Sequence, residues 1–426
     1  MRLALVNPPW SFDGSIYFGC REPHLPLEFG YAQALLAAAG HEAAIFDAQA
    51  GGWELAELAA TVGGFAPDMV VVTTAPSYLF WRCAPPELRV PQLTLQALSG
   101  IGAATVAVGP HGSTTPRSTL AKLRVDAVAI GECEETLVGL ASTPQSAWNG
   151  IAGVCTRAGG VRGGPEAADM ARLPALRWPA EFVSRHAHHH HRFDRTPDGP
   201  GAEIEASRGC PYHCTFCAKD NFRDAYRRRP LATILDELDG LIAQGAAYVY
   251  FVDEIFLPWR QLLEALRERP VEFGVQTRVD LWRPDMLDLL GQAGCVSIEA
   301  GVESLSEAGR GRLDKDCRLS TAELTARLVH AKRTVPFVQA NLIAGAGDDP
   351  EEIAGWRDAL RREGVWANDP VPLFPYPGSP EYRLLWGLPD DDAWERALDW
   401  YLGRYAAFSD IQEARPRRLH ELELRA

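Results

Sequence analysis

The stretch "ASRGCPYHCTFCAKDNFRDAYRRRP" (residues 206–230) places three cysteines, Cys210, Cys214 and Cys217, within eight positions. It contains no fourth cysteine. Four thiolates at close spacing would indicate a closed structural zinc site. Three thiolates predict a metal centre that keeps one coordination position open for another ligand.

Length and composition limit the class of protein. The chain has 426 residues, a formal net charge of −14 and 46% hydrophobic residues, which is enough for two or three domains. The excess of acidic over basic residues argues against a nucleic-acid-binding surface.

No apolar run reaches the roughly 18–20 residues of a membrane helix, so we expect no membrane span. The opening "MRLALVNPP" is typical of a strand rather than a signal peptide, and an odd number of cysteines, nine, does not suit a secreted disulfide framework. These features predict a cytoplasmic protein.

Residues 1–142 alternate between strand-like and helix-like segments. The strand-like segments are near-continuous apolar runs, which is typical of strands buried on both faces of a parallel sheet. We therefore predict a doubly wound parallel sheet, with ligands bound at the carboxyl ends of its strands. The expected strands are "RLALVNP" (2–8), "EAAIFDA" (42–48), "DMVVVTT" (68–74), "TVAVGPH" (105–111) and "DAVAIGE" (126–132).

Residues 143–200 break this alternation and are interpreted as a linker. A small hairpin is expected to turn at Gly159–Gly160. The linker also contains "HAHHHH" (186–191), whose composition would suit metal binding. Our first interpretation of this tract is a solvated or domain-packing segment, and the alternative is a role at the mouth of an active site.

A second alternation covers residues 201–378. It contains six strand-like segments separated by amphipathic helical patterns, fewer than the eight units of a closed (β/α)8 barrel. This pattern predicts a partial (β/α)6 barrel that is open on one side. Residues 379–426 are expected to form a helical tail. The three cysteines follow the first barrel strand, and therefore lie at the carboxyl edge, where barrel enzymes place their active sites.

These features resemble the radical S-adenosylmethionine (SAM) superfamily. The resemblance rests on the C-x3-C-x2-C spacing, on the aromatic Phe216 before the last cysteine, and on a strand and loop at the start of a six-unit barrel. It implies that the cysteines hold a 4Fe-4S cluster whose open iron is chelated by SAM. The cluster then reductively cleaves SAM to a 5′-deoxyadenosyl radical, using an electron from an external donor such as flavodoxin or ferredoxin. The alternative is a zinc knuckle completed by His213.

The same resemblance implies a set of SAM-binding residues at the strand ends. "FVDEIF" stands where the family has a Gly-Gly-Glu motif, although its glycines are absent here. "VSIEAGVES" and "NLIAGAG" stand where the family contacts ribose and adenine. Each carboxylate has the alternative of being a solvated or salt-bridged loop residue. The candidates are Phe216, Asp253, Glu254, Arg278, Glu299, Glu303 and Ile343.

The basic run after the cysteines admits two interpretations. It contains Lys219, Arg223 and Arg227–Arg229. A charge run of this kind predicts a solvated face. The alternative is that one or two arginines cap the active site and meet an anionic group.

The first domain resembles the cobalamin-binding domain that precedes the barrel in many radical SAM enzymes. "VNPP", "SYL", "VGPHGS" and "AIGECEET" carry the resemblance, while the Asp-x-His-x-x-Gly motif that supplies a cobalt ligand is absent after the first strand. Many radical SAM relatives also lack that histidine, and an unligated lower face favours methyl transfer. The implied cobalamin-binding residues are Pro9, Thr74, Ser77, Leu79, Gly109, His111 and Glu132.

The sequence therefore predicts a radical SAM enzyme, most simply one that performs cobalamin-dependent C-methylation of a small-molecule or sugar-like substrate. One alternative is a radical cyclisation or rearrangement, with cobalamin assisting or absent. The other is a non-catalytic module that binds an iron–sulfur cluster or a corrinoid. A methylthiotransferase would carry an additional cysteine set in the first domain, and Cys20, Cys83 and Cys133 do not cluster in sequence.

Overall fold

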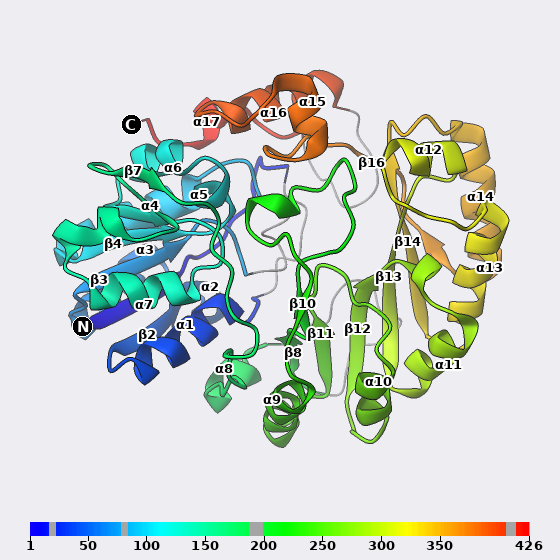
Figure 1. Cartoon of the computed structure of the whole chain (residues 1–426), viewed down its shortest axis with the longest axis horizontal. Coiled ribbons are helices and arrows are strands. Elements are labelled where there is room, and N and C mark those ends of the chain that lie inside the picture. The colour runs from blue at the N-terminus through cyan, green and yellow to red at the C-terminus, as the bar shows by residue number, and fades with distance from the viewer. Residues whose placement is uncertain (17–22, 78–83, 187–198, 406–414, 426) are drawn as a thin grey trace.

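The computed structural model describes residues 1–16, 23–77, 84–186, 199–405 and 415–425. Two seven-stranded sheets stand side by side, and the last helices cross above them from one sheet to the other (Figure 1). None of the helices in the described ranges has the length and apolarity that crossing a bilayer requires.

The first sheet begins with five parallel strands in the order β2-β1-β3-β4-β5. Helices α1 and α7 pack on one face, and α3, α4 and α6 pack on the other. Because both faces are covered, the apolar runs are buried, as predicted for a doubly wound sheet. The elements are β1 (Arg2–Asn7), α1 (Leu27–Ala38), β2 (Glu42–Asp47), α2 (Ala48–Gly51), α3 (Leu55–Phe65), β3 (Met69–Thr73), α4 (Arg89–Leu98), β4 (Ala104–Val108), α5 (Pro110–Thr114), α6 (Pro116–Leu123), β5 (Ala127–Ala129) and α7 (Glu134–Ser142).

The hairpin expected near Gly159–Gly160 is present. Its strands, β6 (Val154–Thr156) and β7 (Gly160–Arg162), pair antiparallel to each other, and β6 pairs antiparallel to β5. Gly160 has φ +61°, a left-handed conformation that glycine adopts at little cost. The hairpin therefore extends the first sheet from within the segment that the sequence suggests is a linker.

The second sheet is the predicted partial barrel. Its parallel strands follow one another in sequence order, and β8 and β15 form the two edges of the main strand path, so the barrel is open between them. Helices α9, α10, α11, α13 and α14 cover its outside (Figure 1). The elements are β8 (Gly201–Ile204), α9 (Leu231–Ala243), β11 (Tyr248–Phe251), α10 (Arg260–Arg267), β12 (Glu272–Thr277), α11 (Pro284–Gln292), β13 (Cys295–Glu303), α12 (Glu307–Arg312), α13 (Thr321–Lys332), β14 (Phe337–Ala344), α14 (Pro350–Arg362), β15 (Trp366–Ala367) and β16 (Val371–Pro372), which pairs with β14.

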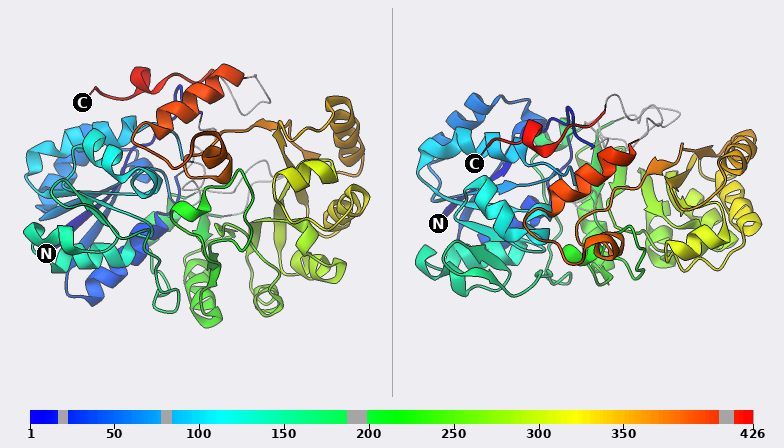
Figure 2. Two further views of the ribbon diagram at one scale, coloured as in Figure 1. Left: turned by 45° about the horizontal axis from the view of Figure 1, so that its top comes forward. Right: turned by 90° about the horizontal axis from the view of Figure 1, so that it is seen from above.

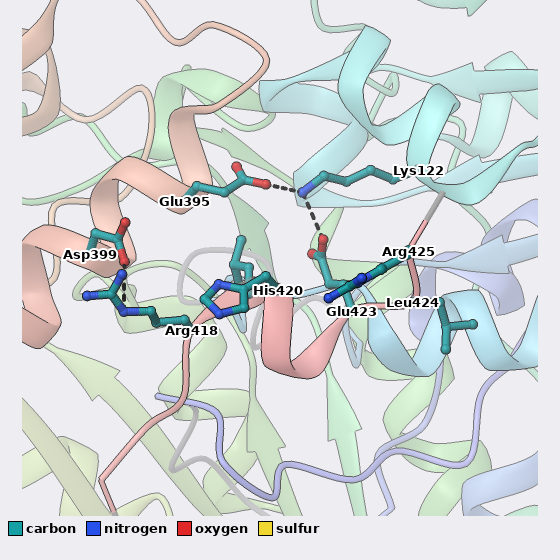
Figure 3. Close-up of a pocket in the computed structure, with 9 residues that line it drawn as sticks. Lys122, Glu395, Asp399, Arg418, His420, Glu423, Leu424 and Arg425 are labelled. Atoms are coloured by element: carbon teal, nitrogen blue, oxygen red, sulfur yellow. Dashed lines mark hydrogen bonds and ion pairs between the residues drawn. The ribbon is translucent and has the colours of Figure 1, made fainter.

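After the barrel, a C-terminal strap returns to the first domain. It comprises the described residues from 379 onward, with α15 (Pro380–Trp386), α16 (Ala393–Arg404) and α17 (Leu419–Leu422) (Figure 2). The Trp394 ring lies 4.5 Å from the His111 ring, and its indole N–H donates to the Thr115 hydroxyl over 3.2 Å. Lys122 of α6 pairs with both Glu395 and Glu423, at a surface pocket between α6, α16 and α17 (Figure 3). The strap therefore ties the barrel to the first domain.

Replacing Trp394 by alanine should loosen this tie. The side chain is 5% exposed, and truncating a buried tryptophan typically costs about 3–5 kcal/mol. We expect Trp394→Ala to lower the urea midpoint clearly, and Trp366→Ala, at a 36% exposed position, to change stability by less than about 1 kcal/mol. Equal midpoints for the two variants would contradict the packing role of Trp394.

Candidate functional site

The three cysteines lie on one loop whose base is closed by a short strand pair. β9 (Ser207–Arg208) pairs antiparallel with β10 (Arg227–Arg228) in a separate two-stranded sheet, so the two ends of the loop between them lie side by side. Gly209 has φ +77°, and a Cβ there would lie 2.2 Å from the Ala225 carbonyl oxygen, so this turn requires glycine. All three cysteines are half-buried. The resulting cluster loop (residues 209–226) holds three thiols above the carboxyl end of β8.

Two of the predicted SAM-binding carboxylates support the base of the cluster loop. Asp253 is buried, accepts a hydrogen bond from the Ala206 N–H over 2.9 Å and contacts the Ser207 hydroxyl. Glu254 accepts from the Gly209 N–H over 2.8 Å, directly before Cys210. Both residues therefore hold the backbone that leads into the cysteines, and their role as SAM contacts stays a prediction.

Arg278 directly follows β12 and lies beside the cluster loop. Its Nε and Nη2 pair with the Asp280 carboxylate, at 3.2 and 2.7 Å, and its guanidinium lies 4.1 Å from the Tyr212 ring centroid. Its Nη1 is buried and finds no hydrogen-bond partner among the described residues. A buried cationic donor of this kind favours an anionic ligand at the same place.

Lys315 brings a second cation to the same side of the loop. Its ammonium donates to the Gly301 carbonyl over 2.8 Å and pairs with Glu303 over 3.1 Å. Glu303 has φ +66°, an uncommon conformation for a residue with a side chain, and strain of this kind often accompanies function. Burial raises the pKa of the Cys214 thiol, and the charges of Lys315 and Arg278 oppose that rise.

The remaining SAM candidates lie at the same edge of the barrel. Phe216 is half-buried on the cluster loop. Glu299 is buried on β13, in register with Gln276 and Gln339 on the neighbouring strands. Ile343 lies near the end of β14, in register with Val371 of β16. The structure thus brings the candidate residues to one edge of the sheet, while their contacts to SAM stay predictions.

The prediction of a solvated face for the basic run is wrong for Lys219, which is buried and pairs with Asp224, and for Arg223 and Arg229. The two arginines are fully buried, Arg223 against Glu254 and Glu205, and Arg229 against Glu237 over 2.7 Å. Arg228 is exposed, as that prediction expects. The physical reason is that other segments of the barrel supply carboxylates to both arginines, at Glu205, Glu254 and Glu237, which the local charge pattern does not reveal.

Arg208 is the centre of this interdomain ion network. Its three guanidinium nitrogens lie 2.8–2.9 Å from carboxylate oxygens of Glu132, Glu134 and Glu205, and all four side chains are fully buried. Although burial alone would raise the pKa of Glu132, the guanidinium of Arg208 and those of Arg227 and Arg223 lower it to about 2. Glu132 thus forms ion pairs with arginines of the barrel, and its role in cobalamin binding stays a prediction.

The other cobalamin candidates lie at the carboxyl edge of the first sheet. Thr74 is buried, and its hydroxyl has no hydrogen-bond partner among the described residues. Gly109 has φ +123°, and a Cβ there would lie 2.5 Å from the Thr74 hydroxyl oxygen. Burial lowers the pKa of His111 to about 3, so the ring under Trp394 is neutral.

Ser77 is buried and its hydroxyl lies 3.0 Å from the Leu25 carbonyl oxygen, while Pro9 follows β1 and is half-buried. Leu79 and residues 187–191 of the histidine tract lie outside the described residues. His186 is buried and its Nδ1 lies 2.6 Å from the Phe182 carbonyl oxygen, which agrees with a domain-packing residue. Tyr212 and Lys315 were missed by the sequence interpretation, because neither follows a strand directly.

Replacing Asp253 by asparagine should flatten the pH dependence of stability. Burial raises the pKa of Asp253 to about 8, against a usual value of 3.8, although hydrogen bonds from Ser207 and Ala206 oppose the rise. Between these two values the unfolded chain releases this proton and the folded chain keeps it, so the free energy of unfolding falls as pH rises through that window. We expect urea midpoints of the wild type to fall from pH 5 to pH 8 more steeply than those of Asp253→Asn. Parallel curves would contradict the assignment.

Parts of this chain are similar in sequence to known proteins. A family model described as the radical SAM superfamily matches residues 204–360. An uncharacterized methyltransferase of Pyrococcus horikoshii is 24% identical over 325 residues, which cover 72% of this chain and 66% of the relative. The anaerobic magnesium-protoporphyrin IX monomethyl ester cyclase of Cereibacter sphaeroides is 24% identical over 414 residues, covering 90% and 64%. The chain thus spans slightly under two thirds of the length of these relatives.

Among solved structures, the fold is similar to that of the radical SAM methyltransferase TsrM from Kitasatospora setae, which was solved with cobalamin and a 4Fe-4S cluster bound. The TM-score is 0.70 at 21% identity, and the match covers 89% of this chain and 76% of TsrM. At this identity the likeness concerns the fold. The match to the family model shows that residues 204–360, which include the three cysteines on their loop, form a radical SAM domain.

Proposed function

We propose that this protein binds a 4Fe-4S cluster through Cys210, Cys214 and Cys217 and cleaves SAM reductively to a 5′-deoxyadenosyl radical. The observation that carries the proposal is the cluster loop, which presents three half-buried thiols and contains no fourth cysteine. Three thiolates leave one position of the cluster for another ligand. When bound there, the cluster supplies the single electron that breaks the sulfur–carbon bond of SAM.

Some residues around the cluster loop support its backbone, and others are suited to bind a ligand. Asp253 and Glu254 fix the backbone before Cys210, which sets where the thiols stand. Arg278, with its buried Nη1, is suited to bind a carboxylate such as that of SAM. Lys315 holds Glu303 beside Gly301, where Glu303 is suited to accept hydrogen bonds from hydroxyl groups.

We further propose that the first domain binds cobalamin and that the reaction is C-methylation of a small-molecule substrate. The buried Thr74 hydroxyl, which has no hydrogen-bond partner among the described residues, supports a ligand at the carboxyl edge of the first sheet. The cobalamin bound to TsrM and the methyltransferase among the relatives favour this chemistry over others. When bound, cobalamin supplies the methyl group. An external reductant such as flavodoxin or ferredoxin supplies electrons.

Anaerobic reconstitution with iron, sulfide and hydroxocobalamin tests both parts. We expect the desalted protein to show cluster and corrinoid absorption, and to form 5′-deoxyadenosine from SAM and dithionite. Cys214→Ala should lose cluster absorption and at least about 100-fold of the 5′-deoxyadenosine rate, because the cluster loses one of three protein ligands. A cluster without 5′-deoxyadenosine would favour a binding module, and 5′-deoxyadenosine without corrinoid would favour cyclisation or rearrangement.

Replacing Glu254 by glutamine should weaken the cluster loop without removing a thiol. Its two oxygens accept hydrogen bonds from the Gly209 N–H and from Arg223 Nη1. In glutamine one of these oxygens becomes an NH2 group, which is itself a donor and would stand opposite one of those two donors. A buried unmatched donor costs about 1–3 kcal/mol. We expect fewer iron atoms per chain after reconstitution of Glu254→Gln, whereas Glu264→Gln, at an exposed position on α10, should match the wild type. Full iron content in Glu254→Gln would contradict this role.

A further inference from the structure

The C-terminal strap exposes an apolar patch. Its members are Leu384 and Leu385 on α15 and Leu388 just after that helix, which are 82%, 40% and 77% exposed. Adjacent exposed leucines are unusual on a soluble protein and often mark a site of protein association.

The segment beneath this apolar patch is fastened to the cluster loop at three points. The Glu381 N–H donates to the Thr215 carbonyl over 2.8 Å, and Thr215 stands between Cys214 and Cys217. Asn221 Nδ2 donates to the Pro377 carbonyl over 2.8 Å, and Arg383 lies 3.9 Å from Asp220. Both views in Figure 2 place α15 against the cluster loop. The apolar patch is therefore the outer surface of the layer that backs the three cysteines.

The apolar patch is exposed on a well-anchored helix. Tyr382 is fully buried, and its hydroxyl oxygen accepts a 2.9 Å hydrogen bond from Arg396 Nη1. The Trp386 ring lies 4.9 Å from the Tyr382 ring and 6.4 Å from the Trp400 ring of α16. Because these aromatic contacts hold the inner face, the leucines are presented to solvent by a fixed element.

Charges of opposite sign border the two ends of the apolar patch. Arg383 lies on the side of the cluster loop, since it pairs with Asp220, and its side chain is 42% exposed. Asp390, Asp391 and Asp392 are exposed beyond Leu388. Arg383 would attract a partner that has acidic residues around its redox group, and the aspartates would repel the same acidic residues. The two forces together would orient that redox group toward the cluster loop.

We propose that the apolar patch is the docking surface for a reduced, low-potential one-electron carrier protein whose redox group has an apolar and acidic border. The proposal rests on the proposed function, because it requires a cluster on the three cysteines. In the transfer the carrier loses one electron and the cluster gains it, and no covalent bond forms or breaks. Docking here places the carrier on the side of the cluster loop that α15 covers.

The test compares a protein reductant with a small one. We expect Leu384→Asp/Leu388→Asp to lower the rate of 5′-deoxyadenosine formation with reduced flavodoxin, at concentrations below saturation, by at least about tenfold. With dithionite, which needs no docking surface, the rate should equal that of the wild type. Val161→Asp is the matched control, because Val161 is 44% exposed on the β7 hairpin of the first domain.

A second variant keeps the test decisive if the double variant folds poorly. Arg383→Glu should raise the flavodoxin concentration needed for half-maximal rate several-fold and reduce the salt dependence of that value, again without changing the dithionite rate. Wild-type rates with flavodoxin in both variants would overturn the docking proposal, as would equal losses with both reductants in both variants. No 5′-deoxyadenosine from the wild type with dithionite would instead overturn the proposed function.

Discussion

The structure depends on a buried ion network in which one arginine joins two domains. Arg208 of the barrel contacts Glu132 and Glu134 of the first domain and Glu205 of the connection between β8 and β9, without access to water. Removing one partner of a buried ion pair typically costs about 3–5 kcal/mol, because the remaining charge stays buried. Since Arg208 directly precedes Gly209 and the cysteines, the first domain helps to fix the cluster loop as well as to cover it.

The sequence predicted the fold because each domain repeats a local pattern. Near-continuous apolar strands such as "MVVVT" require cover on both faces, and six strand–helix units are too few to close a barrel. The burial of Arg223 and Arg229 was not predictable in this way. Their carboxylate partners, Glu205, Glu254 and Glu237, lie outside the basic run on other segments of the barrel. The run itself indicates only that water or opposite charges must surround it.

The candidate site was predictable where the spacing of residues along the chain indicates their chemistry. It was less predictable where the path of a loop brings residues together. C-x3-C-x2-C placed three thiols on one loop, and strand ends located Asp253, Glu254 and Arg278. The partners of these residues were invisible, because Asp253 and Glu254 meet backbone N–H groups of Ala206 and Gly209. Lys315 comes from the connection after α12, whose path back to Gly301 no strand pattern indicates.

The path of the strap has a consequence for how the protein is made. Strand β1 opens the first domain, while Trp394, Glu423 and Leu424 complete contacts on its helices α4, α5 and α6. In the ribosome-bound chain, the first domain therefore emerges early and stays without these contacts until the whole barrel has been translated. Domains tend to fold in order of synthesis, but this one can be completed only after its neighbour.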